Sequence, residues 1–307
     1  MKKYFIITID TEGDNLWGVT DIKAEITTEN ARFLPRFQAL CEKYGFVPTY
    51  LTNYEMAHDG GYREFAREGL AKMTLEVGAH EHAWNQPPYY PLVKSPAHRG
   101  KPYLTEYPKL VIREKLRRLT SLLEEAFDCD ITSHRGGRWS FDKRIAEVLC
   151  DLGYVADCTC TPGISWEGQP GWSIRSKGTD WSSWKGTPEI ICSGVKERHL
   201  VEIPVTVINR GKGTVPAWFR PNGHNCETML GMIHYLKECG TDYIEFMIHS
   251  SELMPGGSPT FKNKGQIDKL YEDIEIIFES VKEAGFIGIG LSNYARLVVD
   301  KKYGGRS

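Results

Sequence analysis

The sequence predicts an α/β protein in which parallel strands are covered by helices. One observation is a repeated pattern, in which a helical segment closed by glycine leads directly into an apolar strand, at Gly45, Gly153, Gly240 and Gly285. Glycine ends a helix readily because it adopts the left-handed conformation that turns the chain back. A second observation is that polar residues collect where predicted strands end. Alternation of strands and helices favours a parallel sheet with helices outside it.

The predicted elements follow one another along nearly the whole chain. Strands are expected at 3–10, 47–52, 75–84, 154–156, 243–249 and 286–291, and a further strand ends in the polar run 133–139. Helices are expected at 28–44, 62–70, 112–126, 227–239 and 267–281, where apolar residues recur at helical spacing, and one more ends at 153. Pro35 is expected to kink the first helix. Residues 189–192 and 199–207 are expected to form a hairpin or two separate strands.

Length, charge and composition limit the class of protein. The 307 residues can fill one barrel-sized domain, and no linker or charge shift divides them, so we expect a single domain over 1–307. The net charge of −2 favours neither a nucleic acid nor an anionic membrane as partner. No apolar run approaches ~20 residues, so no membrane span is expected. The absence of a signal-peptide core and the scattered cysteines favour the cytoplasm, and the oligomeric state is not predicted.

A loop insertion rich in glycine, serine and tryptophan is expected at about 159–188, where periodicity disappears. Its tryptophans are Trp166, Trp172, Trp181 and Trp184. A segment of this length without regular structure is usually functional in a compact domain. Its indoles could pack against the underside of the loop, or they could form an aromatic wall for a sugar ring. The sequence favours neither alternative.

Two histidines at a spacing of two residues suggest a metal site. His80 and His82 end the strand predicted at 75–84 and point to the same face, because side chains alternate along a strand. They stand ~6.6 Å apart along the strand. Their imidazoles can therefore converge on one ion held at roughly 2.0–2.1 Å from each nitrogen. The alternative is a surface strand that happens to carry two histidines.

Four polar clusters fall at the ends of four predicted strands. They are 8–12, 80–82, 133–139 and 247–252. In a parallel barrel the carboxyl ends of the strands meet at one rim. These clusters, far apart in sequence, would therefore line one pocket.

Four motifs in this order resemble those of the polysaccharide deacetylase (NodB-homology, carbohydrate esterase) family. They are 8–12 (TIDTE), 76–82 (EVGAHEH), 134–139 (HRGGRW) and 246–249 (FMIH). The resemblance extends over nearly the whole chain. It implies a distorted (β/α) barrel of seven or eight parallel strands with outer helices. It also implies a divalent metal, most often zinc (Zn²⁺), and hydrolysis of N- or O-acetyl groups on sugars.

The resemblance assigns catalytic roles to three residues. Asp10 matches the base, Arg135 matches the arginine that orients the base, and His249 matches the late histidine that acts as the acid. An amide carbonyl is a poor electrophile and an amine anion is a poor leaving group. Hydrolysis therefore needs an activated water and a proton donor, which these residues would supply.

The metal ligands that the resemblance implies depart from the family pattern at two positions. The metal aspartate normally follows the base directly, but Thr11 stands there, and Glu12 on the same strand face is the expected substitute. The first metal histidine matches His80. The second normally lies four residues further on, where this chain has Trp84, so His82 is the expected stand-in. The expected metal ligands are therefore Glu12, His80 and His82.

An acetylated carbohydrate is the expected partner, and four residues are expected to contact it. They are Trp84, Arg138, Trp139 and Trp166. Two other functions remain open. One is hydrolysis of another C–N bond, in a small cyclic or linear amide, on the same fold. The other is a non-catalytic carbohydrate-binding relative without metal, suggested by Thr11 and Trp84 in place of the usual ligands.

Overall fold

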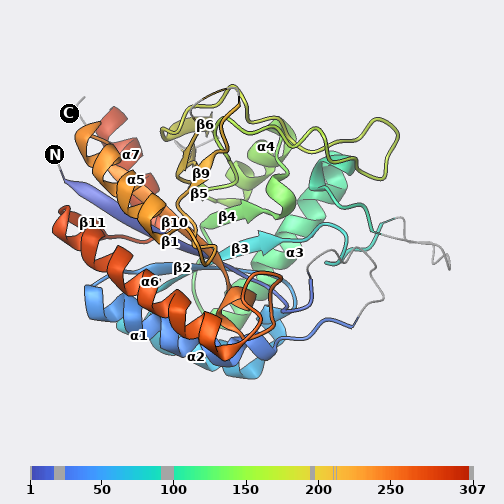
Figure 1. Ribbon diagram of the computed structural model, residues 1–307. Coiled ribbons are helices and arrows are strands. Elements are labelled where there is room, and N and C mark those ends of the chain that lie inside the picture. Colours follow the sequence, from blue (N-terminus) through green and yellow to red (C-terminus); the bar gives the residue numbers. More distant parts are fainter. Residues whose placement is uncertain are drawn as a thin grey trace.

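A curled, mostly parallel sheet forms the centre of the protein in the computed structural model, which describes residues 2–16, 25–90, 100–193, 198–209, 211 and 213–303 (Figure 1). Eight of its strands follow the order β10-β1-β2-β3-β4-β5-β7-β6, and β11 pairs with β1. The strands are β1 (Lys3–Thr11), β2 (Pro48–Thr52), β3 (Glu76–Glu81), β4 (Ser133–Gly136), β5 (Ala156–Asp157), β6 (Glu189–Ser193), β7 (His199–Glu202), β10 (Tyr243–His249) and β11 (Phe286–Gly288). The predicted distorted (β/α) barrel is confirmed, as a half-barrel with helices around it.

One part of the sheet is not parallel. β6 pairs antiparallel with β7, so the hairpin predicted near residues 189–207 is present. A separate antiparallel pair, β8 (Val207–Ile208) and β9 (Ala217–Trp218), follows it. The backbone between β7 and β10 continues irregularly, since the amide of Phe219 donates to Thr206 and its carbonyl accepts from Met247. These contacts carry the wall of the half-barrel toward β10 without a regular strand.

Helices cover the outside of the sheet (Figure 1). They are α1 (Leu34–Tyr44), α2 (Gly60–Lys72), α3 (Lys109–Phe127), α4 (Lys143–Leu152), α5 (Cys226–Glu238), α6 (Lys264–Glu283) and α7 (Leu291–Tyr303). The predicted helices are confirmed, except that Glu29–Phe33 of the first one form a 3₁₀ helix and Pro35 lies in the first turn of α1, not inside it. A proline at this position leaves no helical hydrogen bond unmade. Helix α7 was not predicted from the sequence, because its first residue, Leu291, was expected to be the last residue of the strand 286–291.

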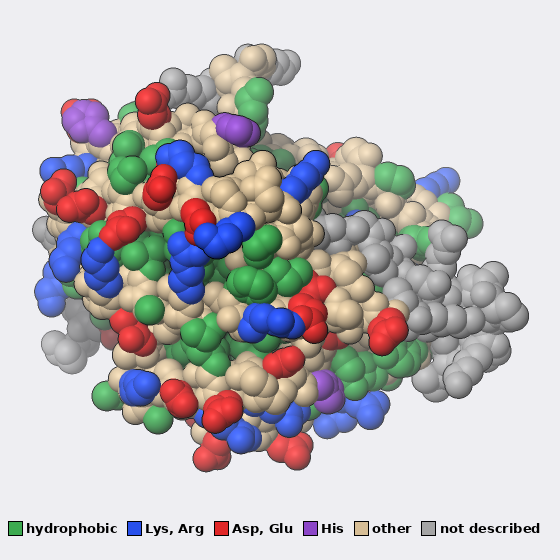
Figure 2. All heavy atoms as spheres, turned by 60° about the horizontal axis from the view of Figure 1, so that its bottom comes forward, with side chains coloured by type: hydrophobic (Ala, Val, Ile, Leu, Met, Phe, Trp, Pro, Cys, Tyr) green, Lys and Arg blue, Asp and Glu red, His purple; other side chains and the backbone are tan. Residues whose placement is uncertain are grey.

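The outer face formed by α1, α2 and α6 carries acidic and basic side chains interspersed with one another (Figure 2). Arg36 of α1 pairs with Asp268 of α6, and Lys43 of α1 pairs with Glu275. This mixture agrees with the small net charge and presents no extended surface of one sign. No helix within the described parts of the chain has both the length and the apolar sequence needed to cross a membrane.

The register of the sheet brings the predicted polar clusters to the same rim. Asp10 on β1 lies beside His249 on β10, and His80 on β3 lies beside Arg135 on β4. All four residues lie at or next to the last residue of their strands. The parallel arrangement therefore assembles the motifs as the sequence predicts.

Some tryptophans of the loop over residues 159–188 pack beneath it, and one forms part of an aromatic wall, so both predicted alternatives occur. Trp181 is 1% exposed, and its indole nitrogen donates to the carbonyl of Trp139 at 3.1 Å. Trp184 packs edge-on against Trp181. Trp166 instead lines the pocket at the rim, whereas Trp172 is largely exposed. Two indoles thus pack under the loop, and one forms part of a pocket wall.

Candidate active site

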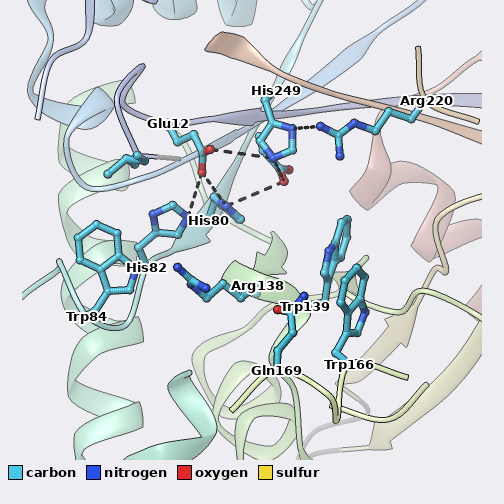
Figure 3. A pocket seen from close by; sticks show the side chains of 13 residues that line it. Glu12, His80, His82, Trp84, Arg138, Trp139, Trp166, Gln169, Arg220 and His249 are labelled. Carbon is cyan, nitrogen blue, oxygen red and sulfur yellow. Dashed lines mark hydrogen bonds and ion pairs between the residues drawn. The ribbon is translucent and has the colours of Figure 1, made fainter. Parts of the chain in front are cut away.

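A pocket at the carboxyl ends of the strands collects nearly all the predicted site residues (Figure 3). Its lining consists of Asp10, Glu12, Leu16, His80, His82, Trp84, Gly136, Arg138, Trp139, Trp166, Gln169, Arg220 and His249. Nine of the ten predicted catalytic, metal and substrate residues are among them. The tenth, Arg135, lies fully buried beneath the pocket. The structure therefore brings the predicted residues together, although their roles stay predictions.

Glu12, His80 and His82 form a cluster suited to a divalent metal. Glu12 Oε2 lies 2.9 Å from His82 Nε2 and 3.4 Å from His80 Nε2. The potential ligand atoms of all three residues lie within 4.8 Å of one another. Tetrahedral ligands at about 2.0–2.1 Å from zinc stand roughly 3.3 Å apart. One carboxylate and two imidazoles at this spacing fit such an ion, with a position left for water or substrate.

The ring of His80 is oriented for metal binding by the strand beside it. Its Nδ1 lies 2.9 Å from the carbonyl oxygen of Arg135, which can only accept a hydrogen bond. Nδ1 is therefore the donor, and Nε2 presents its lone pair to the cluster. His82 is held differently, because its ring stacks on Trp84 at 5.7 Å between centroids. Its buried Nδ1 has no hydrogen-bond partner among the described residues.

Opposite charges in the cluster keep its carboxylate ionised. Burial alone would raise the pKa of Glu12, but His82 and His80 outweigh that effect and leave the pKa well below its usual value. Burial lowers the pKa of His80, yet Asp10 and Glu12 outweigh that effect and raise it to about 9. A cation would replace the proton on His80, so metal binding at this site should be stronger at higher pH.

Asp10 is held by a buried arginine. Arg135 Nη1 donates to Asp10 Oδ1 at 2.6 Å, while its Nη2 donates to Glu245 at 2.8 Å and to Thr8 at 2.7 Å. Burial raises the pKa of Asp10, but Arg135, His80 and His249 together outweigh that effect and lower it. Asp10 Oδ2 remains directed at the pocket, 4.0 Å from His80 Nε2. The arrangement leaves one oxygen of an ionised carboxylate available as a base.

His249 faces Asp10 from the neighbouring strand. Its Nε2 lies 3.7 Å from Asp10 Oδ2, and its Nδ1 lies 3.2 Å from Glu252. Arg220 lies 3.0 Å from the same Nδ1 (Figure 3). Burial raises the pKa of Glu252, but Arg220 and His249 together lower it to about 2. An ionised Glu252 behind the ring holds Nε2 toward the pocket, where it can exchange a proton with a bound ligand.

Three indoles form an aromatic wall on the other side of the pocket. Trp139 and Trp166 stack with their ring centroids 6.4 Å apart and their planes 15° from parallel. Trp218 contacts both of them and lies in an adjoining pocket, which shares Trp139, Trp166 and Arg220 with the first. Flat apolar faces of this kind suit the C–H face of a sugar ring.

Several residues of the site were not predicted from the sequence. Glu245 lies on the same face of β10 as His249, four residues earlier, so strand periodicity carried a signal for it. Glu252 follows His249 by three residues and caps the turn that begins there. Arg220 and Trp218 had no such signal, because the two-residue strand β9 and the irregular segment after it reach the pocket only through the tertiary structure.

Solved structures similar to this chain show which fold it has. A candidate polysaccharide deacetylase from Mycobacterium smegmatis matches with a TM-score of 0.58 and 16% identity, covering 98% of this chain and 92% of that chain. A candidate glycoside hydrolase/deacetylase from Parabacteroides distasonis matches with a TM-score of 0.63 and 12% identity, over 98% and 72%. A Puue allantoinase matches with a TM-score of 0.57 and 12% identity, over 95% and 88%.

Sequence comparison adds nothing to these likenesses, because no family model matches the chain and no curated protein is significantly similar to it. The TM-scores establish the fold, while identities this low leave the activity open. The curled parallel sheet and its outer helices agree with these structures. The chain has the NodB-like (β/α)-barrel fold of polysaccharide deacetylases.

Proposed function

We propose that this protein is a metal-dependent hydrolase that removes acetyl groups from N- or O-acetylated sugars or polysaccharide precursors. The observation that carries the proposal is the cluster of Glu12, His80 and His82 directly beside Asp10. A cation site and an ionised carboxylate in one pocket are what hydrolysis of an unreactive acyl bond requires. The fold shared with a candidate polysaccharide deacetylase and the indole wall support a sugar as substrate.

A divalent cation, most suitably zinc, held by Glu12, His80 and His82 would polarise the acetyl oxygen and lower the pKa of a nearby water to about 7. The remaining chemistry falls to the protein. Asp10 Oδ2 accepts the proton of the attacking water, while Arg135 holds the other carboxylate oxygen in place. His249 Nε2 donates a proton to the leaving nitrogen or oxygen, with its ring oriented by Glu252.

Acetate release and metal content test this proposal together. Zinc-loaded protein should contain about one ion per chain and should release acetate from N-acetylglucosamine oligomers. Asp10→Asn should retain the metal and lose about 10²–10⁴-fold in kcat, the usual contribution of a general base. A chain that binds no divalent metal under any loading condition would instead be the non-catalytic carbohydrate-binding relative.

Hydrolysis of another amide is a second candidate function. An allantoinase has a similar fold, so an enzyme of this architecture can act on a small cyclic amide. The indole wall of Trp139, Trp166 and Trp218 favours a sugar over such a compound. Assays with allantoin beside acetylated sugars would distinguish them, because turnover of allantoin without acetate release would favour the second candidate.

A further inference from the structure

Arg138 is an arginine in the pocket that pairs with no described residue. It is half-buried, and its guanidinium reaches into the cavity (Figure 3). The other half-buried or buried arginines of the described chain all have a hydrogen-bond partner: Arg135, Arg144 and Arg220 bond to carboxylates, as does Arg113, and Arg63 bonds to the carbonyl oxygen of Ala57. Apart from Arg138, the described arginines that have no hydrogen bond or ion pair to another described group are exposed; Arg175 is one of them.

The backbone at Arg138 adopts a conformation that glycine would occupy more easily. Arg138 has φ 56° and Trp139 has φ 58°, so two consecutive large residues are left-handed. Non-glycine residues in this region carry strain, which clusters at ligand-binding sites. The two glycines just before them serve a different purpose. A Cβ on Gly137 would lie 2.3 Å from the carbonyl oxygen of Glu81 and 2.7 Å from the ring of His82. The glycines allow close packing, while the strained positions carry the side chains that line the pocket.

The pocket offers Arg138 no negative charge of its own. Asp10 is paired with Arg135, and Glu12 lies between the imidazoles of His80 and His82. A guanidinium is always charged and presents five donors in a planar fork. Such a group, half removed from water and unpaired, is stabilised most by a bidentate anion.

We propose that Arg138 binds an anionic group, a carboxylate or a phosphate, on the substrate of this pocket. The identification of that ligand as the substrate rests on the proposed function. The anion would lie beside the acetyl group, because Arg138 lines the same pocket as Asp10, His80 and His249. The preferred substrates are therefore acidic or phosphorylated acetyl sugars rather than neutral ones.

Binding of matched neutral and anionic probes tests this assignment. N-acetylglucosamine, N-acetylglucosamine 1-phosphate and N-acetylmuramic acid would be titrated calorimetrically into the zinc-loaded protein at low salt. At least one anionic probe should bind about 10-fold or more tightly than the neutral sugar, as expected for a charge-assisted pair. The two anionic probes distinguish a phosphate from a carboxylate. Equal affinity for all three probes would overturn the assignment.

Two variants assign the preference to Arg138. Arg138→Gln should remove most of the anion preference while leaving the affinity for N-acetylglucosamine within about 3-fold, because only the charge is lost. Arg175→Gln is the matched control, since Arg175 is also left-handed (φ 65°) and has no described hydrogen bond or ion pair, but is exposed. It should retain the full preference. An anion preference that survives in Arg138→Gln would contradict the proposal.

The same titrations in metal-stripped protein exclude direct binding of the anion to zinc. The Arg138-dependent preference should persist there, and its disappearance would assign the anion to the cation and overturn the inference. The proposed function is tested separately by acetate release. If no probe is hydrolysed but the preference depends on Arg138, the deacetylase proposal fails and the anion site stands. If wild type and Arg138→Gln deacetylate neutral and anionic sugars equally, the anion-site proposal fails and the deacetylase proposal stands.

Discussion

At the scale of single residues, Arg135 is the group on which the candidate base depends. It is fully buried and joins Asp10 to Glu245. Its charge lowers the pKa of both carboxylates against the effect of burial, which still leaves the pKa of Glu245 raised. Arg135 makes four hydrogen bonds, because its Nε also donates to the carbonyl oxygen of Cys158. A lysine has three donors on one ammonium group in place of a planar fork, so Arg135→Lys cannot make all four bonds. We expect kcat for acetate release to fall about 100-fold or more, and unfolding in urea to show a loss of about 3 kcal/mol.

Arg144→Lys is the control for this prediction. Arg144 also makes several hydrogen bonds, to Asp142 and to the carbonyls of Thr105 and Tyr107, but lies outside the pocket. Its substitution should lower stability without changing kcat. Equal kcat values for both variants would mean that Arg135 only stabilises the fold.

The strain at Arg138 leads to a second prediction at this scale. Arg138→Gly should raise the free energy of unfolding by about 1 kcal/mol, because glycine adopts φ 56° without a Cβ clash. The gain would be partly offset by the greater freedom of glycine in the unfolded chain. Chemical denaturation measures it, and a lower stability than wild type would show that the arginine itself stabilises the loop.

At the scale of elements, helix α3 buries a lysine against the sheet. Lys115 is 1% exposed, and its ammonium lies 2.7 Å from the carbonyl oxygen of Gln86. Burial lowers its pKa from 10.5 to about 7 despite the nearby Glu81. Between these two values the unfolded chain holds a proton that the folded chain lacks, so Lys115 makes stability rise as pH increases.

Lys115→Met should remove this rise of folding stability with pH. The stability of the variant relative to wild type should therefore decrease by roughly 2 kcal/mol from about pH 7 to about pH 9, since one pKa unit corresponds to about 1.4 kcal/mol. Urea unfolding at several pH values measures it. Lys109→Met on the same helix is the control, because Lys109 is exposed. Parallel pH profiles for wild type and Lys115→Met would contradict the buried, neutral lysine.

At the scale of the whole molecule, metal binding should stabilise the fold because it joins two strands: Glu12 directly follows β1, His80 lies in β3 and His82 directly follows β3. At a free zinc concentration of 100 Kd, binding adds about 2.7 kcal/mol, which corresponds to a rise in Tm of about 5 °C. His82→Ala should lose most of this rise, measured by thermal unfolding with and without zinc.

His58→Ala is the matched control, since His58 is exposed and bonds to the carbonyl of Tyr54 away from the pocket. It should retain the full rise in Tm. A zinc-dependent rise of the same size in His82→Ala would place the metal elsewhere on the protein.

Much of the element order could be predicted from sequence because the signals are local. Glycine at Gly45, Gly153 and Gly285 ends a helix through a left-handed turn, and each has φ between 73° and 96° in the structure. The strand 243–249 was predicted at its observed bounds from its apolar run. Helix α7 was missed because its apolar beginning continues directly from the strand before it, and only packing against β1 and β7 distinguishes the two.

The sequence by itself determined the parallel α/β architecture and the gathering of Asp10, His80 and His249 at one rim, since period-two patterning and strand direction place them there. Only the tertiary structure decided which groups complete the site. Glu245 shares Arg135 with Asp10, and Arg220 reaches His249 from an irregular segment. Such contacts join residues without periodic spacing, so their positions depend on how the whole chain packs.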